Sequence, residues 1–340
     1  MKLGRSLMRF LSSDAFAYTV KRLLQGILTL FLVSVLSFAI IQLTPGNYLD
    51  TLKNNPQISP ERIEELTRQF GLDQPAQVQY WLWLKQILRW PPNFGESFAY
   101  QRPVFDLILE RVAATLLLAI ASILVTWSIA IPLGIVSAVN QNRWSDRSLQ
   151  VFSYVGQGFP SFITALLFLF LAQSTPLFPV GNMTSIDHAD FSTLGKVLDV
   201  GWHMILPTLA LSVTSYAGLQ RIMRGNLLDV LRQNYIQTAR AKGLPENRVI
   251  YVHALRNAVN PLITLLGFEL ASLLSGAFIA EVFFNWPGLG RLTLQAVLLK
   301  DQNLVMASLM MGAAMLVLGN LIADLLLQVV DPRVSAGDHS

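Results

Sequence analysis

The side chains that could do chemistry in this chain are few, and they form no recognisable catalytic set. The 340 residues include no cysteine, which excludes a disulfide, a thiolate metal site and a cysteine nucleophile. The four histidines are scattered and no His-Glu-x-x-His motif occurs; they are His188, His203, His253 and His339. No Gly-x-x-x-x-Gly-Lys-Ser/Thr loop is present to hold the phosphates of ATP. We therefore expect no catalytic site, metal or cofactor in this chain, and any energy source must lie in another subunit.

Three acidic residues stand out because they lie within long apolar stretches: Glu269, Glu281 and Asp324. A charge at the centre of a membrane-spanning helix costs about 2.5–3.5 kcal/mol on insertion scales. Either Glu269 and Glu281 face a water-filled translocation pathway, or they pair with polar groups on neighbouring helices or on a partner chain. Both alternatives stay open for Glu269, whereas we expect pairing for Asp324.

The composition indicates that these acids are held in a membrane. The chain is 53% hydrophobic and 14% charged, with a mean hydropathy of +0.47, whereas soluble domains carry about 25% charged residues. A net charge of +4 is too small to favour a nucleic-acid partner. We predict an all-α polytopic membrane protein with six transmembrane helices. The expected spans are 23–43, Val112–Val139, Leu149–Ala172, His203–Leu219, Val259–Phe284 and Leu304–Val330.

The distribution of basic residues predicts the orientation of the chain in the membrane. Residues 220–258 carry seven basic and two acidic side chains, and the turn after the second span carries Arg143 and Arg147. Because basic loops stay in the cytoplasm, this pattern places both termini (1–22 and 331–340) inside and residues 44–111 outside. The core 112–330 then holds five spans. Thr44-Pro45-Gly46 follows the first apolar run, so we expect an uncleaved span there rather than a signal peptide.

The extracytoplasmic loop 44–111 is expected to be partly helical. Ser59 and Pro60 are typical of a helix start, Gly71 of its end, and the apolar residues between them, up to Phe70, share one face. A second segment, 75–90, is rich in aromatic side chains: Tyr80, Trp81, Trp83 and Trp90. Such residues most often lie at the level of the lipid headgroups. A role in ligand binding is the alternative.

The basic cytoplasmic segment has the pattern of two helices joined by a tight turn. Apolar residues recur at helical spacing from Leu228 to Ala239, and Arg240 falls where a cation suits the end of a helix. Gly243 can adopt the positive φ of a helix stop, and Pro245 is typical of the start of the next helix. A DNA-binding role does not fit an element tethered between two membrane spans. A merely solvated basic loop is the other alternative.

The residues of this segment also carry a family resemblance. Residues 235–244 read Tyr-Ile-Gln-Thr-Ala-Arg-Ala-Lys-Gly-Leu, and residues 253–258 read His-Ala-Leu-Arg-Asn-Ala. They resemble the cytoplasmic Glu-Ala-Ala loop of bacterial ABC importer permeases, and more narrowly the dipeptide/oligopeptide/nickel branch. The chain departs from the wider pattern at Gln237, Thr238, His253 and Arg256, in forms that the peptide branch shares. Further similarity runs in order through residues 70–75, 94–97, 287–291 and 331–334.

The resemblance implies a type I importer permease whose loop 220–258 docks on an ATPase subunit. The residues that match the family's coupling loop are Tyr235, Thr238, Ala239, Arg240, Ala241, Lys242, Gly243, Leu244, His253, Leu255, Arg256 and Asn257. The implied partners are a second permease in a heterodimer, two cytoplasmic ATPases, an extracytoplasmic solute-binding protein and the lipid of a bacterial inner membrane. The implied cargo is a di- or oligopeptide, with nickel or glutathione as alternatives. An ion-driven secondary transporter is the rival hypothesis, although it leaves the ordered loop unexplained.

Overall fold

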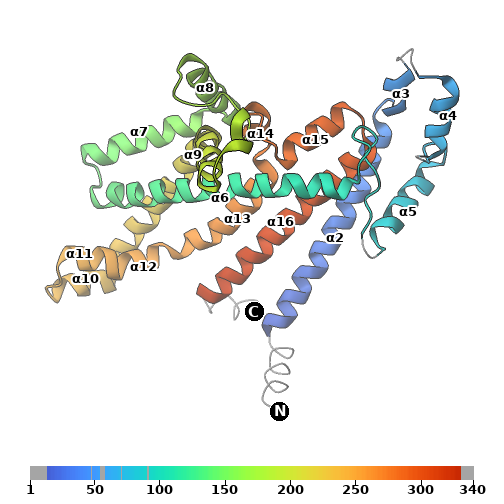
Figure 1. Cartoon of the computed structure of the whole chain (residues 1–340). Coiled ribbons are helices and arrows are strands. Elements are labelled where there is room, and N and C mark those ends of the chain that lie inside the picture. Colours follow the sequence, from blue (N-terminus) through green and yellow to red (C-terminus); the bar gives the residue numbers. More distant parts are fainter. Residues whose placement is uncertain (1–13, 47, 54–57, 70, 90–91, 331–340) are drawn as a thin grey trace. The chain divides into compact units, whose positions relative to one another are not determined.

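The structure is a computed structural model that describes residues 14–46, 48–53, 58–69, 71–89 and 92–330 (Figure 1). The expectations for the terminal segments 1–13 and 331–340, and for Phe70 and Trp90, fall outside these residues. The described part is helical and contains no strand, only an isolated bridge between Glu96 and Pro103. The all-α prediction is therefore confirmed.

The helical elements follow one another along the chain from the N-terminal apolar helix to the C-terminal one. They are α2 (Asp14–Leu43), α3 (Tyr48–Lys53), α4 (Pro60–Gln69), α5 (Ala76–Ile87), α6 (Val104–Val139), α7 (Trp144–Gly158), α8 (Ser161–Ser174), the 3-10 helix η1 (Ile186–Asp190), α9 (Thr193–Leu231), α10 (Asn234–Ala241), α11 (Glu246–Arg248), the π-helical segment η2 (Val249–Ala254), α12 (Leu255–Ala258), α13 (Asn260–Gly276), α14 (Phe278–Phe283), α15 (Leu289–Leu298) and α16 (Gln302–Val330).

The chain divides into two compact units, and the larger one has residues 116–286 as its continuous part. Its main apolar core is formed by α6, α9 and the elements from α10 to α13. The helices approach closely at Gly134, where a Cβ atom would lie 2.8 Å from Cβ of Met223 and 2.9 Å from the carbonyl oxygen of Gln220. Only a glycine allows α6 and α9 to pack at this distance.

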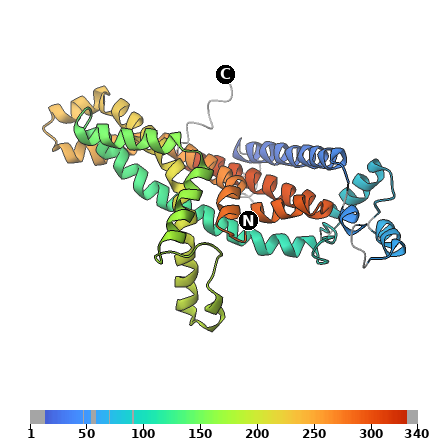
Figure 2. The same ribbon diagram turned by 90° about the horizontal axis from the view of Figure 1, so that it is seen from above.

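The smaller unit comprises residues 20–115 and 287–315. Phe38 of α2, Trp83 of α5 and Met306 of α16 form its buried apolar cluster, and Figure 2 shows α2 and α16 running side by side. The Tyr80 and Ser34 hydroxyls lie 2.9 Å apart, which ties α5 to α2. Tyr80 and Trp83 therefore pack in a protein core, while Trp81 is 62% exposed and is the one of the three that fits the headgroup expectation.

The described residues provide four or five of the six expected membrane spans by length and composition. Within the described residues, α2, α6, α9 and α16 are long and apolar enough to cross a membrane, and α7 and α8 form a fifth span if the 99° bend between them is allowed. The expected span Val259–Phe284 is divided at Ala277 into α13 and α14. Helix α13 has 17 residues, which is about 26 Å at 1.5 Å per residue and a little short of the hydrocarbon core.

Candidate functional site

The helix–turn–helix segment (residues 234–258) begins where α9 breaks. The sequence predicts a continuous helix through this region, but α9 ends at Leu231, and Gln233 has an extended backbone (φ −71°, ψ 146°) before α10 starts at Asn234. The redirected helix α10 buries Ile236 completely. Burial of this side chain is the physical reason for the break, because packing overrides the local helical preference of the sequence.

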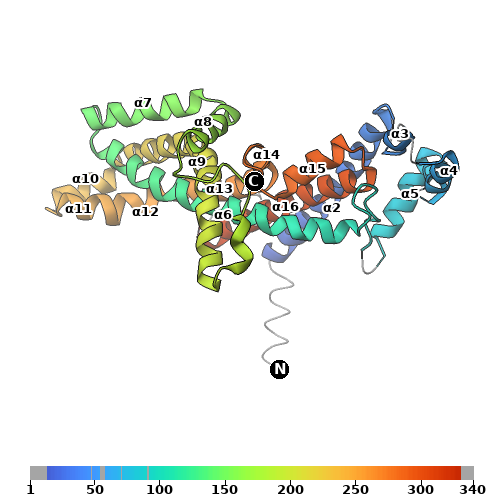
Figure 3. The same ribbon diagram turned by 45° about the horizontal axis from the view of Figure 1, so that its top comes forward.

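One face of the segment joins the core of the larger unit. Ile236, Val249 and Ala254 are each 0% exposed and pack with Leu227 of α9 and Ile135 of α6. Figures 1 and 3 show α10, α11 and α12 lying together beyond the end of α9. The buried side chains fix the segment to two long helices, α6 and α9.

The turn between α10 and α11 depends on Gly243. Its φ is +74°, a conformation that side-chain-bearing residues rarely adopt. The N–H of Gly243 donates to the carbonyl oxygen of Arg240 at 2.9 Å, and the N–H of Leu244 donates to that of Ala239 at 3.4 Å. No atom would lie within 4 Å of a Cβ at Gly243. The predicted glycine stop is therefore confirmed, and it rests on backbone conformation rather than on lack of space.

An ion pair closes the same turn from the side. Arg240 donates from Nε to Oε2 of Glu246 at 3.1 Å and from Nη2 to Oε1 at 2.6 Å. The hydrogen bond from Arg240 holds the pKa of Glu246 below its usual range, and the same bond raises the pKa of Arg240. Both side chains are about half exposed, so a pair of this kind stabilises by only about 0.2–1 kcal/mol.

The opposite face of the segment is open and partly apolar. Tyr235, Tyr251 and Val252 are 46%, 57% and 55% exposed. The amide of Asn257 donates to the Tyr235 hydroxyl at 2.9 Å and to the carbonyl oxygen of His253 at 3.3 Å, which holds α10 and α12 together on this side. Exposed aromatic side chains set among cations are typical of a surface that binds another protein.

The structure brings all the coupling-loop residues named from the sequence into this one segment. The exposed ones are Tyr235, Thr238, Arg240, Ala241, Lys242, Gly243, Arg256 and Asn257, and the half-buried ones are Ala239, Leu244, His253 and Leu255. Three buried residues that anchor the segment were not among the site residues expected from the sequence: Ile236, Val249 and Ile250. The signal that could have found them is that they are β-branched apolar residues in a segment otherwise rich in polar and basic side chains.

The two candidate pathway acids have different surroundings. Glu269 of α13 is half-buried and accepts a hydrogen bond from the indole N–H of Trp127 on α6. Glu281 of α14 is 0% exposed. This burial does not fit the expectation that Glu281 faces a water-filled pathway, because the side chain is enclosed by protein. Among the described residues, no group of three His, Asp or Glu side chains could hold a metal ion.

Comparison with known proteins gives two family matches that together span most of the chain. Residues 130–336 match the model described as "Binding-protein-dependent transport system inner membrane component", and residues 15–119 match its N-terminal counterpart. The oligopeptide transport system permease protein AppB of Bacillus subtilis is 38% identical over 320 residues, which is 94% of this chain and 99% of AppB. The glutathione transport system permease protein GsiC of Escherichia coli K12 is 35% identical over 317 residues, covering 93% and 98%.

A solved structure shows the same fold. A chain of the MetNI methionine ABC transporter, in an inward-facing conformation, superposes with a TM-score of 0.52 at 15% identity. The match covers 67% of this chain and 97% of the MetNI chain. Because the two sequences are only 15% identical, the structural similarity shows a shared fold and carries no conclusion about function.

Proposed function

Since the chain belongs to the binding-protein-dependent transport system inner membrane components, the permease subunits of ABC importers, we propose that it carries di- or oligopeptides across the bacterial cytoplasmic membrane. The cargo is inferred from relatives named as oligopeptide and peptide permeases. Glutathione is the second candidate, because GsiC is nearly as similar and glutathione is itself a small peptide. Nickel remains a further alternative from the family resemblance.

The helix–turn–helix segment is the proposed contact with the ATPase subunit. The observation that carries this assignment is its construction: a buried face fixed to α6 and α9, and an open face with Tyr235, Tyr251 and Val252 exposed. A rigid element of this kind can pass a displacement from a partner into the spans. The ATP is hydrolysed by two such partner subunits, and the permease supplies the path.

The remaining assembly follows from the family. A second, similar permease would complete the translocation path, and an extracytoplasmic binding protein would deliver the cargo on the side of residues 44–111. We propose six spans with both termini in the cytoplasm, in which α7–α8 and α13–α14 are the two broken spans. Glu269 is the proposed pathway residue.

The decisive variant is Gly243→Asp. An aspartate at φ +74° would strain the backbone and add a negative charge to the turn that Arg240 and Glu246 close. We expect normal membrane insertion and abundance, with uptake of labelled di- and tripeptides abolished. Gly225→Ala is the matched control, since a Cβ there also meets no atom within 4 Å but the backbone is ordinary helix. Normal uptake by the aspartate variant would remove the coupling role.

Deletion of the gene separates the candidate cargoes. Loss of peptide uptake, restored by the wild-type chain, supports the peptide assignment. Unchanged peptide uptake in cells without a redundant system would exclude peptides as the cargo, and uptake of glutathione and then nickel would be measured next. An ion-driven transporter would take up cargo in reconstituted vesicles without ATP, whereas the proposed permease requires ATP and its partner subunits.

A further inference from the structure

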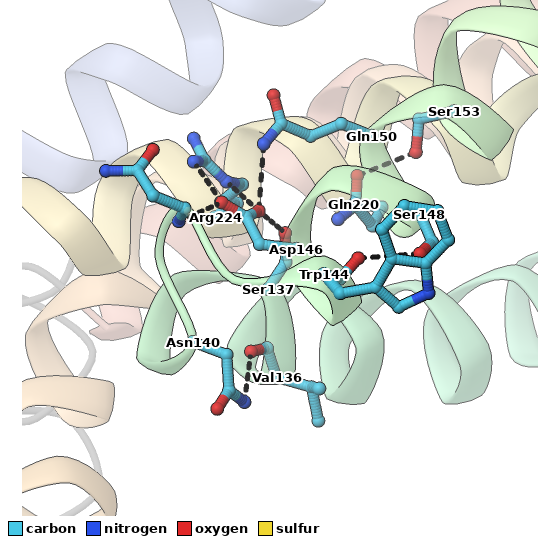
Figure 4. Close-up of polar contacts among 11 residues, drawn as sticks. Val136, Ser137, Asn140, Trp144, Asp146, Ser148, Gln150, Ser153, Gln220 and Arg224 are labelled. Carbon is cyan, nitrogen blue, oxygen red and sulfur yellow. Dashed lines mark hydrogen bonds and ion pairs between the residues drawn. The ribbon is translucent and has the colours of Figure 1, made fainter.

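A buried polar interface joins α7 to α9 next to the helix–turn–helix segment, and Figure 4 shows its members. Asp146, Gln150 and Ser153 contribute from α7, and Gln220 and Arg224 contribute from α9. Each set recurs at the three- or four-residue spacing that keeps side chains on one face of a helix. We call these five residues the α7–α9 interface.

Asp146 is the centre of this interface and is 0% exposed. Arg224 donates to its carboxylate twice, from Nε at 2.7 Å and from Nη2 at 2.8 Å. The backbone N–H of Asn142 donates at 2.8 Å, Gln150 donates at 2.9 Å, and the Ser137 hydroxyl donates as well. A carboxylate with this many donors is fully satisfied, so it holds the end of α6, the start of α7 and α9 in one geometry.

The contact continues along both helices. The Ser153 hydroxyl donates to Oε1 of Gln220 at 2.7 Å, and both side chains are buried. Beyond them, a Cβ atom at Gly156 would lie 3.6 Å from Cβ of Ala217. The two helices are therefore in close contact from the cytoplasmic turn up to the end of α7.

One end of the α7–α9 interface adjoins the core that holds the helix–turn–helix segment, and the other end adjoins the bend between α7 and α8. On α9, Met223 and Leu227 flank Arg224 and pack into the core that holds Ile236 of the helix–turn–helix segment. On α7, the helix ends at Gly158, and α8 then leaves at an angle of 99°. The α7–α9 interface thus lies between the proposed ATPase contact and the bend in the third expected span.

We propose that Asp146 and Arg224 are positioning residues for coupling. They make the α6–α7 turn, α9 and the helix–turn–helix segment move as one body, so that ATPase closure displaces α7 and is delivered to the bend before α8. The inference rests on the proposed function, because it specifies how a displacement of the docked segment is transmitted to the membrane spans. An ion pair that only stabilises the fold would show no effect on coupling.

The first test measures cargo transported per ATP hydrolysed by the reconstituted complex, using Asp146→Asn and Arg224→Gln variants that assemble normally. We expect this ratio to fall by about tenfold or more, because each change leaves the other member of the pair, Arg224 or the fully buried Asp146, charged but without its counter-ion. Arg147→Gln is the matched control: Arg147 adjoins Asp146 on α7, and its side chain is exposed. It should keep the wild-type ratio. A wild-type ratio in the Asp146 and Arg224 variants would overturn the proposal.

The second test does not depend on how well those variants fold. The natural chain has no cysteine, and the Cβ separation at Gly156 and Ala217 suits a disulfide. In the G156C/A217C double variant, oxidation should close the interface permanently, as counted by loss of maleimide-reactive thiols. We expect uptake by the oxidised complex to stay within about twofold of the reduced one. Loss of uptake on oxidation, restored by reductant, would show that the interface must open.

The two failures are distinguishable. If the wild-type complex shows no ATP-driven uptake of any tested cargo, the proposed function fails. If the wild-type complex transports but the oxidised double variant does not, the function stands and the one-body inference falls. Each single-cysteine variant controls for the substitutions alone.

Discussion

Replacing Gly134 by alanine should weaken the contact on which the helix–turn–helix segment depends. The new Cβ would lie 2.8 Å from Cβ and Cγ of Met223 and 2.9 Å from the carbonyl oxygen of Gln220. Two of these atoms are fixed by the backbone of α9, so a rotamer change of Met223 cannot relieve the clash. Carbon contacts are optimal at about 3.5–4.0 Å, which requires α6 and α9 to separate by up to about 1 Å.

The size of the effect follows from two opposing contributions. Overpacking of a core costs about 1–3 kcal/mol, while exchanging glycine for alanine inside a helix returns about 0.8–1 kcal/mol. We expect a net loss of stability of about 0–2 kcal/mol for Gly134→Ala. The control Gly225→Ala lies on α9 with no atom within 4 Å of its Cβ. This substitution should therefore stabilise the protein by about 0.8–1 kcal/mol, because alanine has a higher helix propensity than glycine and causes no clash here.

The assay is the melting temperature of the purified complex in detergent, with uptake measured in parallel. Gly134→Ala should melt below the wild-type complex and Gly225→Ala at or above it. A melting temperature for Gly134→Ala equal to or above that of Gly225→Ala would refute the reasoning. It would mean that the two helices do not approach as closely as the structure shows.

Three further predictions concern the segment and the candidate pathway. Ile236→Ala should cost about 2–4 kcal/mol of local packing and make the segment more accessible to limited proteolysis, whereas Ile236→Val should cost under about 1.5 kcal/mol. Because the pKa of Glu246 is lowered in the folded state, its pair with Arg240 stabilises the turn above the unfolded pKa of the glutamate. That stability is lost as the pH falls through the lower, folded pKa, so proteolysis of the turn should increase only in the acid range and Glu246→Gln should remove the dependence. Glu269→Gln should reduce uptake more than abundance, and unchanged uptake would remove Glu269 from the pathway.

The sequence predicted those features of the segment that are set by local chemistry. Gly243 follows basic residues at the end of a helical pattern and precedes Pro245, a combination with one common backbone solution. The structure has that solution, with positive φ at Gly243 and α11 beginning directly after Pro245. Family resemblance added the identity of the loop, which periodicity alone does not provide.

Other features depend on contacts between residues far apart in the chain, and the sequence did not show them. In the sequence, Asp146 is a single acidic residue in a basic turn. Its partner Arg224 lies on another helix, so the ion pair was not predicted. The break before α10 exists because Ile236 reaches the core, while the local pattern favours a continuous helix. The aromatic residues Tyr80 and Trp83 fitted a membrane interface by composition but pack against α2. In each case the deciding partner is distant in sequence.

Helix α9 is uninterrupted over 39 residues, from Thr193 to Leu231, even though Pro207 lies within it. Figures 1 and 3 show that the helix bends along its length, so that its first and last parts run in different directions. A proline inside a helix removes one backbone hydrogen bond and is a common cause of such a kink. The bend makes α9 an elbow with two arms, of which the later one carries Gln220 and Arg224 and packs against α7. That arm can turn about the bend while the arm that begins at Thr193 keeps its own contacts.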